Sequence, residues 1–238
     1  MLLNFTHQAA YILHARSFRD TSLLLEIYTK EFGRLGVIAR GAKRGKRPLT
    51  GILQPFTPLS LSAKGRGEII TMTLVEQTKM PWRLSGQRQI AGLYVNELMV
   101  RLLGKHEGAG LLFENYQHTL EALQEGSVEI ALRCFERRLL EALGYGLTFD
   151  VTLPDCTPIR AEDTYTYIPH QGFALLEKRT SSTLHFRGSA LFKIAAEDYA
   201  DETARLGAKQ LFRAVLQSYL GNKPLMSRQL WQKEESME

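Results

Sequence analysis

The first 80 residues of this chain contain five short runs with strand character and no long stretch with helical spacing. Glycines separate these runs, which are Ala10–His14, Thr21–Tyr28, Gly33–Ala39, Phe56–Leu61 and Glu68–Glu76. Five short strands within about 75 residues, with no helix between them, are typical of a small closed or nearly closed barrel.

Two of the runs carry the detail of this prediction. In Glu68–Glu76, Ile70, Met72 and Leu74 alternate with threonines, so we expect one apolar and one polar face. Pro58 lacks a backbone N–H and places the fourth run towards a sheet edge. The pattern as a whole predicts the five-stranded oligonucleotide-binding (OB) barrel.

Helical spacing begins at Ser85. Ser85–Leu103, Leu111–Leu123 and Ser127–Leu143 carry apolar residues at helical intervals, and a wide apolar stripe covers Leu211–Leu220. The sequence therefore predicts an α+β chain, with an OB-fold domain over residues 1–80 and an α-helical domain over residues 81–238.

The predicted helical domain is interrupted between about residues 145 and 186. Pro154, Pro158 and Pro169 break the helical spacing there, and Thr164–Ile168 with Phe173–Leu176 can form a small hairpin. We expect an irregular insert with a small β element in this region.

Positive charge is concentrated in the predicted barrel. The 238 residues carry 30 Lys and Arg against 25 Asp and Glu, but residues 1–80 hold 12 of the basic residues and only 5 of the acidic ones. The net charge is therefore +7 in the barrel region and −2 in the remainder. Such asymmetry points to a module that meets a polyanion.

Much of this charge falls in one predicted loop. The loop candidates for DNA contact are Arg40, Lys43, Arg44, Lys46 and Arg47, and Arg34, Lys64 and Arg66 extend the patch if the barrel brings the neighbouring turns to one side. Five neutralised phosphates on a single strand would give a salt slope of about −3.5 on a log–log plot. The alternative is a basic loop that is simply solvated. Aromatic residues that could stack on bases are Phe18, Tyr28, Phe32 and Phe56, and the alternative for each is a place in the barrel interior.

No pattern for catalysis, metal or nucleotide binding stands out. The glycines around Lys46 do not have phosphate-loop spacing, the six histidines are scattered, and no cysteine pair has zinc-ligand spacing. Cys134 lies on a predicted helix and is interpreted as a partly buried, inert thiol. We therefore expect no enzymatic activity, no cofactor and no metal.

One predicted helix carries a different kind of candidate site. Arg133, Arg137 and Arg138 flank an apolar face that includes Leu132, Phe135 and Leu139. An apolar groove rimmed by arginine can hold a peptide with a hydrophobic residue and a terminal carboxylate. The alternative is that the arginines pair with Glu136 and Glu141 along an exposed face.

The beginning of the chain has no signal-peptide pattern, and no apolar run reaches about 18 residues. We therefore expect no membrane span, and a cytoplasmic protein.

Several strings, in this order, resemble the RecO family of bacterial recombination mediators. They are TSLLLEIYTKEFGRLGVIARGAKR from Thr21, LQPFTPLSL from Leu53, GRGEI from Gly65, GLYVNEL from Gly92, ALRCFERRLLEALGYG from Ala131 and YLGNKPLMSRQL from Tyr219. The resemblance runs from about Tyr11 to Trp231, and no single string decides it.

The resemblance implies an OB barrel with a helical domain and a nucleoid-associated role in DNA repair and recombination. It implies binding of single- and double-stranded DNA, strand annealing, and work with RecR to load RecA onto DNA coated by single-stranded-DNA-binding protein (SSB). The loop arginines and lysines with Arg34 match the basic stretch of the family's barrel. Arg133 matches an arginine that holds the SSB tail in some members, and Leu132 and Arg137 are its neighbours on the helix. The family's four-cysteine zinc module is not implied, because only Cys156 lies in residues 145–186.

Two other classes of function remain as alternatives. One is a metal-dependent nucleic-acid-processing enzyme that uses the scattered carboxylates. The other is a protein-interaction adaptor whose basic patch meets acidic proteins rather than DNA.

Overall fold

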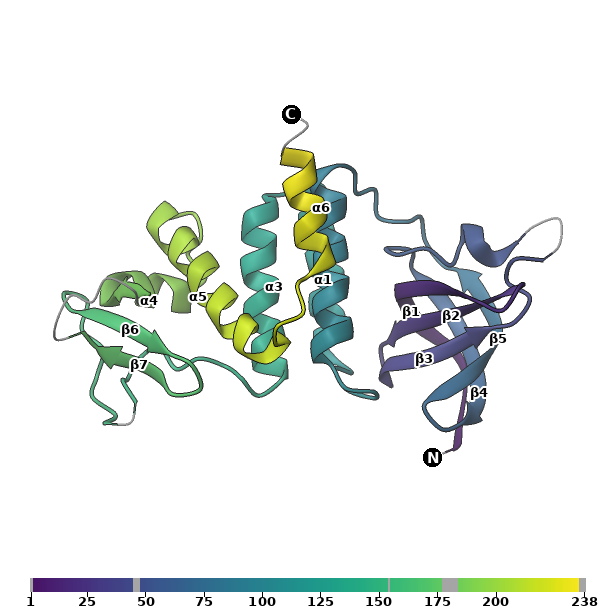
Figure 1. Cartoon of the computed structure of the whole chain (residues 1–238), viewed down its shortest axis with the longest axis horizontal. Helices are drawn as coiled ribbons and strands as arrows, with labels where there is room; N and C mark the ends of the chain where they lie inside the picture. Colours follow the sequence, from purple (N-terminus) through teal and green to yellow (C-terminus); the bar gives the residue numbers. More distant parts are fainter. Residues whose placement is uncertain (1, 45–47, 154, 177–183, 236–238) are drawn as a thin grey trace. The chain divides into compact units, whose positions relative to one another are not determined.

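The computed structural model describes residues 2–44, 48–153, 155–176 and 184–235 (Figure 1). The chain forms two compact units, which are Met1–Val128 with Pro224–Glu238, and Glu129–Lys223. The division into an OB-fold domain over residues 1–80 and a helical domain over residues 81–238 remains a prediction. By compactness, the first unit also takes in the helices that follow the barrel.

Five strands of the first unit close into a barrel (Figure 1). They are β1 (Leu2–Phe18), β2 (Ser22–Thr29), β3 (Gly33–Ala39), β4 (Leu59–Arg66) and β5 (Ile69–Gln77). Their order is β1-β2-β3-β5-β4, and β4 pairs back to β1. All pairings are antiparallel except that of β3 with β5. The predicted five-stranded OB-type barrel followed by a helical region is confirmed.

Alternate side chains of the strands fill the barrel. Ile12, Leu25, Val37, Leu61 and Ile70 are among the buried residues of this core. Since successive side chains point to opposite faces of a strand, the residues between them, such as Lys64 on β4, face outward.

The strands differ from the prediction at three places. β4 is Leu59–Arg66 rather than Phe56–Leu61, so Pro58 precedes it, and the strand pairs with both β1 and β5 instead of lying at a sheet edge. β1 begins eight residues before the predicted run, because its first half pairs with β4 while polar residues such as Asn4 and Thr6 face solvent. In β5 the predicted alternation fails at Leu74, which is 43% exposed. A bulge shifts the pairing so that Met72 lies opposite Ala63 but Leu74 lies opposite Ser62, which leaves Thr73 as the extra residue.

Three helices complete the first unit: α1 (Gln87–Leu102), α2 (Leu111–Glu125) and α6 (Met226–Glu235), with a short 3-10 helix, η1, over Leu49–Gly51. A buried aromatic cluster joins α2 to the barrel, in which Tyr11 and Tyr28 pack against Phe113 and Tyr116. The Tyr28 hydroxyl donates to the carbonyl of Gly108, and burial raises the pKa of this tyrosine. The outer face of β2 is thus covered at this end by the segment around α2.

The second unit combines helices with a small sheet. It contains α3 (Val128–Ala142, whose first residue is counted with the first unit), α4 (Gly188–Ala195) and α5 (Glu202–Leu220). The sheet has the order β7-β6-β8, from β6 (Thr164–Ile168), β7 (Gly172–Leu175) and β8 (His185–Arg187). The expected hairpin between residues 164 and 176 is thereby confirmed.

The end of α3 shows why the predicted helix stops where it does. Gly144 has a φ of +79°, and the amide groups of Gly144 and Tyr145 donate to the carbonyls of Glu141 and Leu140. This is a Schellman motif, for which a residue without a Cβ is favoured just past the helix end.

Candidate nucleic-acid interface

The basic loop after β3 is anchored to the turn between β1 and β2. The Lys43 amide donates to the Thr21 carbonyl at 3.0 Å, and the Lys43 Nζ donates to the Ser17 Oγ at 2.7 Å. Ala42 is fully buried in the barrel core and its carbonyl accepts from the Leu49 amide. These contacts hold the loop against the barrel, while Arg40, Lys43 and Arg44 stay exposed.

This contact adds two cations that sequence reasoning missed. Arg16 and Arg19, at the end of β1 and in the turn after it, are exposed beside the loop, and the Arg19 guanidinium lies 5.3 Å from the centre of the Phe18 ring. They join the loop only through the contact between Lys43 and Thr21, and no spacing in the sequence predicts this contact. We name the five exposed residues the loop group: Arg16, Arg19, Arg40, Lys43 and Arg44.

Lys46 and Arg47, which the sequence also places in this loop, lie outside the described residues. Their role in DNA binding remains a prediction.

Lys64 and Arg66 lie on a different part of the barrel. Both are exposed on the outward face of β4, and we name them the hairpin group because the β4–β5 turn follows at once. Arg66 is the register partner of Leu2 on β1, while Lys64 is the partner of Thr71 on β5. Leu2 and Ile69 beside them are exposed apolar residues.

Arg34 is not brought together with the other candidates. It lies six residues before Arg40 on β3, a distance of about 20 Å along an extended strand. Its Nη1 donates to the Val100 carbonyl at 2.7 Å and lies 3.4 Å from the Glu26 carboxylate, and its side chain is only 14% exposed. The structure therefore commits this guanidinium to contacts inside the protein.

The cations of the first unit fall into two groups, those that form ion pairs and those that do not. Lys105 lies 2.6 Å from Glu26, and Lys30 lies 3.3 Å from Glu114. By contrast, the loop and hairpin groups form no ion pair within the described part of the chain. Cations that are exposed and without an opposing carboxylate can bind phosphates without first breaking an ion pair.

The aromatic candidates divide in a similar way. Tyr28 and Phe56 are buried, and Phe32 is half-buried and stacked on Phe5 with ring centres 4.9 Å apart. Phe18, half-buried beside Arg19, is the one of the four that lies at the loop group.

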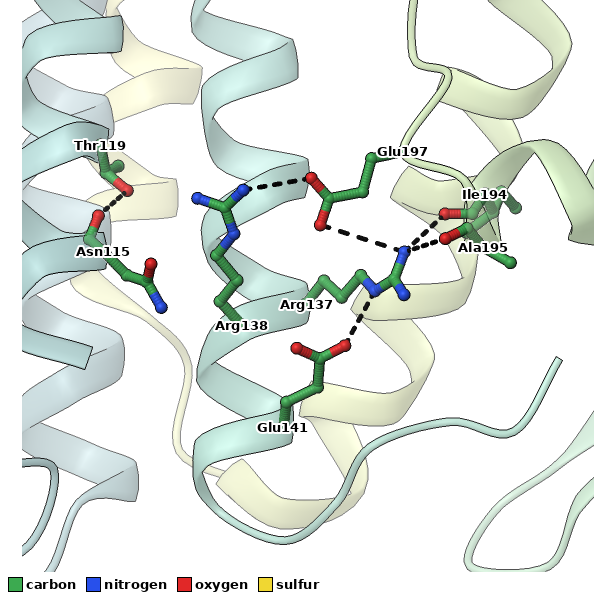
Figure 2. A network of polar contacts seen from close by, with 8 residues as sticks. All are labelled: Asn115, Thr119, Arg137, Arg138, Glu141, Ile194, Ala195 and Glu197. Carbon is green, nitrogen blue, oxygen red and sulfur yellow. Dashed lines mark hydrogen bonds and ion pairs between the residues drawn. The ribbon is translucent and has the colours of Figure 1, made fainter. Parts of the chain in front are cut away.

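The arginines of α3 all form ion pairs. Figure 2 shows those of Arg137 and Arg138. Arg133 lies 3.0 Å from Glu136, as the alternative expectation had it, but this pair is buried rather than exposed. Leu132 is also buried. Arg138 lies 3.2 Å from Glu197.

Arg137 makes the most contacts of the three. Its Nε donates to Glu141 at 2.9 Å and its Nη1 donates to the carbonyls of Ile194 and Ala195 at 3.0 and 2.6 Å, as Figure 2 shows. Partial burial acts to lower the pKa of Arg137, but the carboxylates of Glu141 and Glu197 have the larger effect. The net result is a pKa above the usual value for arginine. Arg137 also borders a small hollow, lined by Leu140, Glu141, Leu147, Phe149 and Phe212.

Three further features would point to other functions: a reactive cysteine, a metal site and a membrane-spanning helix. Cys134 is half-buried, and burial, foremost, raises the pKa of its thiol, which disfavours a reactive thiolate. Within residues that the structure describes, no three His, Cys, Asp or Glu side chains gather as metal ligands. None of the described helices has both the length and the apolar character to cross a membrane.

Comparison with known proteins identifies the family. A model of the recombination protein O N-terminal region matches residues 1–81, and one of the C-terminal region matches residues 83–229. The chain belongs to the RecO family.

Curated RecO relatives match nearly the whole chain. The DNA repair protein RecO of Coxiella burnetii is 39% identical over 223 residues, covering 94% of this chain and 96% of the relative. That of Actinobacillus succinogenes is 39% identical and covers 95% of both chains. That of Dechloromonas aromatica is 37% identical, covering 97% of this chain and 96% of its own. The resemblance noted in the sequence is thus confirmed over both parts of the chain.

Proposed function

We propose that this chain is a mediator of DNA repair and homologous recombination that binds single- and double-stranded DNA and anneals complementary strands. The observation that carries the proposal is the loop group, in which five exposed cations without ion-pair partners in the described structure gather on an OB-type barrel. Its membership in the RecO family supports the same function.

The mechanism requires no bond-making chemistry. Two DNA strands repel each other, and a surface of flexible lysines and arginines lowers this repulsion by neutralising phosphates and releasing counterions. The anchored loop supplies such cations at a fixed place on the barrel, while their side chains remain free to follow a moving strand. We therefore propose a non-enzymatic role, carried out in the cytoplasm in association with the nucleoid.

The proposed partners are the SSB C-terminal tail and RecR, with which the protein would help to load RecA onto SSB-coated DNA. On α3, Arg137 is the residue that supports tail binding, because its side chain is 21% exposed beside apolar side chains and can exchange its ion pair with Glu141 for the carboxylate of the tail. Arg133 and Leu132 are buried, so they would support the tail site through the packing of α3. A tail held in this way would raise the effective DNA concentration at the barrel.

A charge-reversal experiment tests the proposal. The variant Arg40→Glu, Lys43→Glu, Arg44→Glu is compared with Arg160→Glu, Arg213→Glu, Lys223→Glu, which makes the same change in net charge at three exposed positions of the second unit. Loss of three phosphate contacts should flatten the salt slope for single-stranded DNA by about 2 and slow annealing. The control should bind and anneal like the wild type.

Thermal unfolding of both variants shows whether the fold is retained. Equal annealing by the two folded variants would refute the assignment of the loop group. DNA cleavage by the wild type that a chelator abolishes would favour a metal-dependent enzyme instead. Tight binding of acidic peptides, with no DNA binding, would favour an adaptor.

A further inference from the structure

The outward face of the barrel carries its unpaired cations in two places. The loop group lies where the β1–β2 turn meets the loop after β3. The hairpin group, Lys64 and Arg66, lies on β4, two strands from β3. β4 also pairs with β1, but Lys64 and Arg66 lie opposite Asn4 and Leu2, at the other end of β1 from Arg16. The question is whether these form one surface or two.

The strand register gives the separation. Lys64 pairs with Thr71, and Thr71 pairs with Ile38 on β3, so two strand spacings, about 10 Å, lie between Lys64 and β3. Arg40 continues β3 in one direction. Arg66 lies in the opposite direction because β4 is antiparallel to β5, which is itself parallel to β3. The Cα atoms of Arg40 and Arg66 are therefore separated by roughly 15–20 Å.

This separation allows two strands to bind at once. Ile38 and Thr71, which lie between the groups, carry no charge. By the same register Lys64 lies about 12 Å from Arg40, so the two groups are roughly 12–20 Å apart. Phosphates at this separation are beyond the Debye length of about 8 Å at physiological salt, so a strand on one group repels a strand on the other only weakly. Each strand can then be held by its own cations.

The hairpin group has a border of exposed aliphatic side chains, whereas the apolar residue at the loop group, Phe18, is half-buried beneath Arg19. Leu2 is 65% exposed and pairs with Arg66, and Ile69, 47% exposed, follows Arg66 across the two-residue β4–β5 turn. Exposed aliphatic side chains beside cations can contact the faces of unstacked bases. A duplex hides those faces in its stack, so this arrangement fits a single strand.

We propose that the barrel holds both strands of an annealing pair on one protein molecule. The loop group retains the first strand through its phosphates. The hairpin group captures the second strand, with unpaired bases against Leu2 and Ile69. This inference rests on the proposed function, since it assigns a place to each strand in annealing.

Native mass spectrometry of the full chain with two non-complementary oligothymidylate and oligocytidylate strands tests the arrangement. The wild type should form a complex of one protein with one of each strand. The variant Lys64→Glu, Arg66→Glu should bind one strand with an affinity within about twofold of the wild type, since distant sites act independently. It should lose the second strand, and annealing should slow by about tenfold or more because two phosphate contacts are lost.

The variant Arg213→Glu, Lys223→Glu, at two exposed positions of the second unit, is the matched control and should retain the ternary complex. Equal loss of first-strand binding in the hairpin variant and in Arg40→Glu, Lys43→Glu, Arg44→Glu would show one continuous surface and overturn the inference. A ternary complex that persists in the hairpin variant would also overturn it. If the wild type binds no DNA, the proposed function itself fails, and this result is distinct from both others.

Discussion

Asn96 connects the barrel to the two helices that follow it. Its side-chain amide donates to the Leu13 carbonyl at 3.2 Å and lies 3.5 Å from the Ile12 carbonyl, while its Oδ1 accepts from the Tyr116 hydroxyl at 2.8 Å. Both side chains are buried. One buried amide on α1 therefore joins the backbone of β1 to the Tyr116 hydroxyl of α2.

Replacing this residue should destabilise the protein. Asn96→Ala leaves the buried Tyr116 hydroxyl without its acceptor, and a buried polar group without a partner costs about 1–3 kcal/mol. We expect a loss of about 2–3 kcal/mol in the free energy of unfolding, measured by urea titration. Asn222→Ala, at an exposed asparagine after α5, is the control and should change stability little. A stable Asn96→Ala variant would show that these hydrogen bonds contribute nothing net.

Only some of the cations available for DNA binding can be recognised from the sequence. The loop cations are recognisable because they are adjacent in the chain and lack neighbouring carboxylates. Arg34 looks the same by that criterion, but its partners Glu26 and Val100 come from β2 and α1. Arg16 and Arg19 join the site only through the contact of Lys43 with Thr21. Pairing in space, rather than charge, decides which cations are available.

At the scale of elements, α5 begins at a carboxylate that is bound from two sides. Asp201 accepts from the Ala204 amide at 2.8 Å as the N-cap, and its other oxygen lies 2.5 Å from the Lys193 Nζ. The hydrogen bond from Lys193, and next that from Ala204, lower the pKa of Asp201. A carboxyl with a lowered pKa stabilises the fold above its unfolded-state pKa of about 3.9, and this is lost as the pH falls through the folded-state value.

This linkage gives a pH-dependent prediction. Asp201→Asn keeps a side-chain oxygen at the N-cap but removes the charge, so at pH 7 the variant should unfold at a lower temperature than the wild type. The difference should narrow below about pH 4, where the wild-type carboxyl itself becomes protonated. Thermal unfolding at pH 7 and pH 3 measures both gaps. A gap of equal size at both pH values would contradict a charge-based contribution.

Elements were predictable where their period was long and uninterrupted. Three of the strands and the first three helices follow apolar patterns over seven residues or more, and the structure reproduces them closely. β8, α4 and α6 were not predicted. β8 has three residues and α4 has eight, which is too short for a period to be distinguished, and the bulge at Thr73 depends on a partner strand that the local pattern does not contain.

At the scale of the whole molecule, the chain leaves the first unit after Val128 and returns to it at Pro224. The returning segment forms α6, which packs along α1 in the same unit (Figure 1). Leu225 and Ser227 are buried at the start of this helix. No local sequence pattern predicts this return, because the contact joins residues more than 100 positions apart.

Glu97 of α1 fixes the start of α6. Its two carboxylate oxygens accept from the amides of Met226 and Ser227, each at 2.9 Å, and one of them also accepts from the Ser227 Oγ at 2.6 Å. The amides at a helix N-terminus have no partner within the helix, and the helix dipole favours a negative charge there. A residue of another helix thus provides the cap that α6 lacks in its own sequence.

Removing this charge should loosen α6 without unfolding the barrel. In Glu97→Gln, an amide group replaces one acceptor oxygen and faces an N–H donor, so at least one charge-assisted hydrogen bond, worth about 2 kcal/mol, is lost. Hydrogen exchange at Met226, Ser227 and the rest of α6 should become roughly 30-fold faster, while exchange in β1–β5 stays unchanged. Glu121→Gln, at an exposed glutamate of α2, is the control and should leave α6 as protected as in the wild type. Unchanged exchange in Glu97→Gln would mean that the packing of α6 on α1, rather than the carboxylate, returns the end of the chain to the first unit.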